Sequence, residues 1–104
     1  MIIKLSKPHT YEDKELTEVD LDFGKATTNV LIRADRRLEQ LKMVPPVKQL
    51  DTTYCLLVAS FITGIPFKVL ETLPLSDGNQ ITTRVSGFLL GAAEEDMIPT
   101  TLEI

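Results

Sequence analysis

The most constraining feature of the sequence is the run of residues 55–62, in which every residue except Ser60 is apolar. Asp51 precedes this run at a position suited to capping a helix, and Gly64 follows it at a position suited to a left-handed helix end. A helix that is apolar on every side must be buried on every side. We therefore predict a central helix between Asp51 and Gly64, with Phe61 at the centre of the core.

The length and composition of the chain bound what can pack around such a helix. A chain of 104 residues suits one domain, and 43% hydrophobic with 25% charged residues is an ordinary globular balance. The apolar run is far shorter than the roughly 20 residues of a membrane span. The first residues also lack the apolar stretch of a secretory signal. We expect a cytoplasmic protein with no membrane partner.

The N-terminal part of the chain alternates apolar and polar residues with the period of a half-buried strand. Asp13 lies between the two alternating segments, where its tolerance of left-handed backbone angles suits a turn. We predict a β-hairpin that ends at Gly24. The apolar residues that define its strands are Ile3, Leu5, Val19, Leu21 and Phe23.

Three further segments have helical spacing. In the first, Thr27 or Thr28 can cap the start, and Pro45 with Pro46 stops the helix. A short helix follows Pro66 and ends at Pro74, and a fourth is capped by Ser76 and ends by Gly91. The apolar stripe of the first consists of Val30, Leu31, Ala34, Leu38 and Leu41.

The predicted fold class is therefore mainly α, an N-terminal β-hairpin followed by a compact bundle of about four helices. Residues 1–91 form a single hairpin-plus-helices domain. Residues 92–104 combine the acidic cluster Glu94, Glu95 and Asp96 with Pro99 and have no helical period. We expect this segment to be a flexible C-terminal tail.

The reactive side chains are too few for most catalytic or metal sites. The chain has one histidine, His9, and one cysteine, Cys55, whereas a triad or zinc site needs several such groups together. Asp20 and Asp22 share a strand face but lack the spacing of a calcium loop. We predict no catalytic, cofactor-binding or metal-binding residues and no cofactor, so the protein is not expected to be an enzyme.

One concentrated basic feature is present in the first helical segment. The spacing of Arg33, Arg36 and Arg37 places them together on the face opposite the apolar stripe. They form either a solvated face partly neutralised by Asp35 and Glu39, or a docking surface for an acidic partner, because arginine makes paired contacts with carboxylates. The three arginines are the predicted partner-binding residues.

Nucleic-acid binding is the main alternative from another functional class. Residues 61–70 place a glycine corner between apolar helical segments, as in a helix-turn-helix regulator. The recognition helix would offer only Lys68 as a cation, against Glu71, and the formal net charge of the chain is −4. Both features disfavour contact with phosphates, so we expect no nucleic-acid partner.

The succession of segments along the chain resembles the tail assembly chaperones of tailed bacteriophages and prophages. Each segment alone is weakly specific, but together they cover roughly residues 2–90 in the order that the family shows. A departure is Asp13, where similar sequences often turn on a glycine. The segments are residues 3–8, 11–21 and 31–36, the apolar helix from Tyr54, the corner 63–67, the cap 73–77 and the ending 85–89.

The resemblance implies a chaperone that binds the tape measure protein, keeps it soluble and assists assembly of the tail tube. It also implies action in the host bacterial cytoplasm, absence from the mature virion, and contact with the tail tube protein through a longer frameshifted form. A structural tail completion or connector subunit would share the size and solubility of this chain and remains an alternative. A homo-oligomer is compatible with all of these functions.

Overall fold

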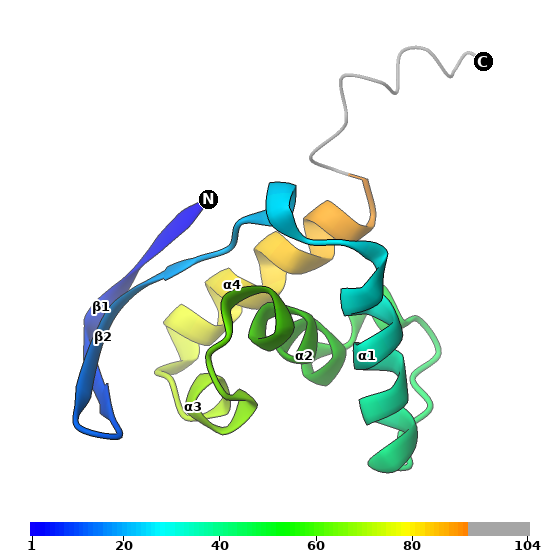
Figure 1. The fold of residues 1–104 in the computed structure, drawn as a ribbon, viewed down its shortest axis with the longest axis horizontal. Helices are drawn as coiled ribbons and strands as arrows, with labels where there is room; N and C mark the ends of the chain where they lie inside the picture. Colours follow the sequence, from blue (N-terminus) through cyan, green and yellow to red (C-terminus); the bar gives the residue numbers. More distant parts are fainter. Residues whose placement is uncertain (92–104) are drawn as a thin grey trace.

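Residues 1–91 form a two-stranded antiparallel sheet followed by four α-helices (Figure 1). The computed structural model describes these residues, and the predicted tail at 92–104 lies outside them. The predicted hairpin and helices, and with them the fold class, are confirmed. The elements are β1 (Ile2–Tyr11), β2 (Lys14–Asp20), α1 (Thr28–Gln40), α2 (Thr52–Thr63), α3 (Phe67–Glu71) and α4 (Leu75–Leu89), with 3-10 turns η1 (Phe23–Lys25) and η2 (Lys48–Leu50).

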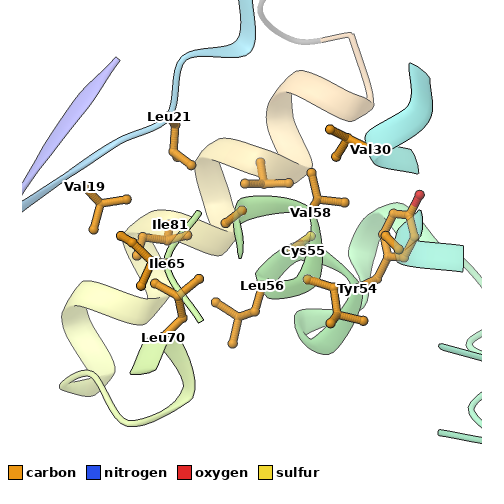
Figure 2. Packing of buried hydrophobic residues seen from close by; sticks show 14 of the residues in the cluster. Val19, Leu21, Val30, Tyr54, Cys55, Leu56, Val58, Ile65, Leu70 and Ile81 are labelled. Atoms are coloured by element: carbon orange, nitrogen blue, oxygen red, sulfur yellow. The ribbon is translucent and has the colours of Figure 1, made fainter. Parts of the chain in front are cut away.

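The apolar helix α2 is the centre of the molecule, as predicted. It contacts α1, α3, α4 and η2, and Figure 2 shows its side chains packed among Val19 and Leu21 of the hairpin region and Ile81 of α4. Six consecutive residues of α2 are buried, which a one-sided helix could not achieve. They are Tyr54, Cys55, Leu56, Leu57, Val58 and Ala59.

Both predicted ends of α2 are confirmed. The Asp51 carboxylate accepts a hydrogen bond from the backbone N–H of Tyr54 at 2.9 Å, which satisfies one of the free amides of the first turn. Gly64 closes the helix with φ of 82°, a left-handed angle that glycine adopts without strain. Phe61, however, is only half-buried, so its predicted place at the centre of the core is wrong.

The hairpin turns on two residues with left-handed backbone angles. Glu12 has φ of 47° and Asp13 has φ of 64°, and positive φ at both central residues is the signature of a type I′ turn. The predicted turn position at Asp13 is therefore correct. The predicted end of the hairpin at Gly24 is wrong, because β2 ends at Asp20 and Phe23 begins the turn η1.

The strand β1 departs from regular pairing in its middle. Lys4 pairs with Glu18 and His9 pairs with Leu16, so the residues between them on β1 outnumber those on β2. Such irregularities tolerate a proline and leave backbone groups unpaired within the ladder. This stretch contains Pro8, and it also contains Ser6, whose backbone N–H points out of the sheet to a helix.

The helix that receives Ser6 is α4. The Asp77 carboxylate is 1% exposed and accepts hydrogen bonds from the Ser6 N–H at 3.0 and 3.2 Å and from the Ser6 Oγ at 2.9 Å. Asp77 lies in the first turn of α4, where a negative charge is favourable. Ser76, the predicted cap, makes no such contact, and Pro74 occupies the capping position.

The end of α1 also differs from the prediction. The helix stops at Gln40, well before Pro45 and Pro46, and Lys42 adopts a left-handed φ of 59°. A left-handed residue cannot continue a right-handed helix, so the turn at Lys42 ends α1. Leu41 is therefore 40% exposed instead of contributing to the buried stripe.

Candidate functional site

The three predicted partner-binding residues lie together on α1. Arg33, Arg36 and Arg37 are spaced by three and four residues, so their side chains emerge on neighbouring turns of one helix face. All three are exposed. We call this surface the arginine stripe.

Two contacts hold the side chains of the arginine stripe. The Arg33 guanidinium carbon lies 4.5 Å from the centroid of the Phe61 ring, a cation–π arrangement that contributes about 0.5–1 kcal/mol at exposed sites. Arg37 Nη1 donates a hydrogen bond to Gln40 Oε1 at 2.9 Å. Neither contact supplies a negative charge, so the stripe stays positively charged.

The stripe has no carboxylate partner among residues 1–91, since none of the ion pairs in this part of the chain includes its arginines. Asp35, which was expected to neutralise them in part, instead accepts a hydrogen bond from Lys48 Nζ of η2 at 2.9 Å. This hydrogen bond, together with the charge of Asp35, raises the pKa of Lys48. Asp35 therefore joins α1 to the following loop.

The position of the stripe on the molecule differs from the simple expectation of a face opposite the core. Phe61 belongs to α2, so its contact with Arg33 places the start of the stripe beside the line where α1 meets α2. Phe61 is half-buried at this line, so part of its surface remains accessible beside the stripe. An approaching partner would meet positive charge next to an aromatic ring.

A small apolar cavity of about 200 Å³ opens where the N-terminal part of α1 meets the C-terminal part of α4. One wall is formed by Phe23 and Phe88, whose rings are stacked with centroids 4.1 Å apart and an interplanar angle of 7°. No charged residue lines the cavity, so it suits an apolar side chain. The other lining residues are Ala26, Thr27, Thr28, Val30, Leu31, Val58, Ile62 and Leu89.

The remaining reactive side chains are engaged in structural contacts. His9 lies in β1, and its Nε2 is 3.1 Å from Thr72 Oγ1 beside α3. Cys55 is buried, and burial raises the pKa of its thiol to about 11. Asp22 pairs with Lys25 at 3.8 Å. Within residues 1–91 there is no group of three side chains that could hold a metal ion.

The glycine corner of the helix-turn-helix hypothesis is present, but the helix that follows it is short. α3 contains only the residues Phe67–Glu71, and its Leu70 is buried against the core. Lys68 is the sole cation of α3. A helix of this length offers too few exposed side chains to read a groove.

Comparison with protein-family models, with curated proteins and with solved structures finds no match to this chain. No helix in the part of the chain that the structure describes is both long and apolar enough to cross a membrane. The arginine stripe and the apolar cavity are thus the features from which a function can be argued. Sequence patterns located the first but missed the second, since Phe23 and Phe88 come from distant segments.

Proposed function

We propose that this protein is a tail assembly chaperone of a tailed phage or prophage, which binds the tape measure protein and keeps it soluble until the tail tube surrounds it. The observation that carries the proposal is the order of sequence segments that resemble this family, from the strand residues 3–8 to the ending at 85–89. A long and partly apolar partner needs its sticky surface covered before assembly.

The surface of α1 supplies a physical basis for binding. The arginine stripe is exposed and lacks an ion-pair partner within residues 1–91, and Phe61 lies beside it. Arginine and aromatic side chains are enriched where proteins bind one another. An acidic helical segment of the tape measure protein is the partner that this combination of charge and ring fits.

Co-expression with the tape measure protein of the same genome tests the proposed function. We expect the tape measure protein to stay in the soluble fraction when this chain is present and to aggregate without it. The variant Arg33→Ala/Arg36→Ala/Arg37→Ala should fold normally and lose most of this effect, because the stripe contributes charge but little burial. A Lys4→Ala/Lys7→Ala/Lys14→Ala variant is the matched control, since it removes the same charge from the hairpin.

Three outcomes would contradict parts of the proposal. An insoluble tape measure protein beside abundant folded chaperone would count against the function itself. Full rescue by the arginine variant would move the binding surface elsewhere. Recovery of this chain from purified virions would favour a structural tail completion or connector subunit.

A further inference from the structure

The strand β2 forms an open edge of the sheet. The sheet has only two strands, and it lies along one side of the helices (Figure 1). Among residues 1–91, no hydrogen bond reaches the backbone of β2 from any element other than β1. The peptide groups of β2 that point away from β1 therefore have no protein partner in this part of the chain.

The hydrogen bonds of the hairpin show which peptide groups these are. The Leu21 N–H donates to the Met1 carbonyl at 2.7 Å, and the Met1 amino group donates to the Leu21 carbonyl at 3.2 Å. In an antiparallel pair, residues bonded in this way alternate with residues whose N–H and C=O groups point away from the partner strand. The register is regular from here to the pair of Lys4 and Glu18, so the peptide groups of Asp20 and Glu18 point outward.

The opposite edge of the sheet is already partly occupied. The Ser6 N–H of β1 donates to the Asp77 carboxylate of α4 at 3.0 and 3.2 Å, and α4 packs against β1. A row of unpaired N–H and C=O groups is a template for a further strand. The edge that can accept a further strand is therefore that of β2.

The side chains of β2 restrict which strand can pair with it. Glu15, Glu18 and Asp20 are exposed, and Lys14 is the only cation of the strand. Asp20 lies 3.6 Å from the amino group of Met1, whereas Glu15 and Glu18 have no ion pair within the described residues. Because like charges placed opposite each other destabilise a sheet, this edge disfavours an acidic strand, including β2 of a second copy. Lysine or arginine opposite Glu18 and Asp20 is favoured.

We propose that the edge of β2 binds an extended, lysine- or arginine-rich segment of a partner protein as a third strand of the sheet. Hydrogen bonds between main chains hold such a strand, and alternate side chains select it. Glu18 and Asp20 are two residues apart, so their side chains lie on one face and select cations at every second position of the segment. The site is distinct from the arginine stripe on α1 and does not depend on the proposed function.

Two peptides as long as β2 distinguish strand pairing from attraction between charges alone. The first is acetyl-Thr-Lys-Val-Lys-Thr-Lys-Val-amide with a fluorescent label. The second has the same sequence and charge but is N-methylated at each lysine, which removes the N–H groups that would face Glu18 and Asp20. We expect the full-length protein to bind the first peptide roughly tenfold more tightly, as measured by fluorescence anisotropy.

A matched pair of variants tests the backbone of β2. Glu18→Gln and Glu18→Pro remove the same charge, but only Glu18→Pro removes the outward N–H, at an edge position where proline is tolerated. We expect Glu18→Pro to bind the first peptide roughly three- to tenfold more weakly than Glu18→Gln. In the parent protein, the peptide should protect the Asp20 amide from hydrogen exchange.

Reversal of charge tests the preference for cations with the backbone unchanged. Glu15→Lys/Glu18→Lys should lose binding of the lysine peptide and bind its glutamate counterpart instead. Glu39→Lys/Glu71→Lys makes the same change in net charge at exposed sites outside the hairpin. This control should still prefer the lysine peptide.

Equal affinities for the plain and N-methylated peptides, with an unprotected Asp20 amide, would overturn the proposal. Equal binding of a peptide with glutamine in place of lysine would overturn the preference for cations. A dimer of the free protein that Glu18→Pro dissociates would overturn it in favour of a second copy of the chain. None of these measurements contains the tape measure protein, so their failure leaves the chaperone assignment to its own co-expression experiment.

Discussion

Asp77 is the most unusual residue of the structure, because it is a buried carboxylate that no lysine or arginine of residues 1–91 pairs with. Its charge is met by the donors of one residue, Ser6, and by the amide-rich first turn of α4. Hydrogen bonds to a charged acceptor are stronger than neutral ones. Asp77 therefore fastens the hairpin to the helices.

Replacement of Asp77 tests this function directly. Asp77→Ala should lower the free energy of unfolding by about 1.5–3 kcal/mol, since it removes the hydrogen bonds that the Asp77 carboxylate accepts from Ser6. Ser6→Ala removes only the hydroxyl and should cost about 1 kcal/mol. Urea denaturation measures both, with Asp22→Ala as an exposed ion-pair control expected to cost under about 0.5 kcal/mol. If Asp22→Ala and Asp77→Ala lower the free energy of unfolding by similar amounts, the Asp77 contact contributes no more than an exposed ion pair.

Cys55 makes the stability of the protein depend on alkaline pH. Burial raises the pKa of its thiol from 9.0 to about 11, so the thiol ionises in the unfolded chain before it ionises in the native protein. Stability is unaffected below the unfolded pKa and falls as the pH rises from about 9 to 11. We expect the parent to lose about 2 kcal/mol more than Cys55→Ala across this range. Chemical denaturation at each pH measures the difference, and parallel curves would contradict it.

At the scale of elements, the stability of the fold depends on α2, and burial varies along that helix. Leu57 is 2% exposed, whereas Phe61 is half-buried beneath Arg33. Truncating a large side chain at a partly exposed site lowers the free energy of unfolding less than truncating a buried one, because part of the exposed side chain is already in water.

Truncation of the two residues should therefore have unequal effects. We expect Leu57→Ala to cost about 2–5 kcal/mol, the usual loss in a core, and Phe61→Ala to cost about 1–2 kcal/mol. Thermal or urea unfolding of both variants measures the contrast. A loss for Phe61→Ala as large as that for Leu57→Ala would restore the burial expected from the sequence.

Elements whose signals are local were predictable from the sequence. The caps Asp51 and Gly64 and the turn at Asp13 act within a few residues of themselves, so their chemistry is visible in the sequence. The Ser6–Asp77 contact was not predictable, since its partners are 71 residues apart and it depends on an irregularity of β1. Nor was the half-burial of Phe61, because an apolar run does not reveal which of its residues lies at the edge of the core.

At the scale of the whole molecule, the candidate binding surface could be predicted only in part from the sequence. The spacing of the arginines placed them on one face of α1, and the structure shows that face to be exposed. Asp35 pairs with Lys48 of η2 and not with the arginines. No sequence pattern indicated η2, so this ion pair could not be predicted. The apolar cavity needs four separate segments to come together. Charge can be counted in a sequence, but its neutralisation depends on tertiary contacts.

The fastening of the hairpin by Asp77 has a consequence for synthesis on the ribosome. Ser6 emerges 71 residues before its partner, which at elongation rates of about 5–20 residues per second is roughly 4–14 s. An isolated two-stranded hairpin is marginally stable in water. The nascent hairpin therefore lacks its contact with Asp77 until α4 leaves the exit tunnel. The contact between Ser6 and Asp77 can therefore form only after α4 has been synthesised.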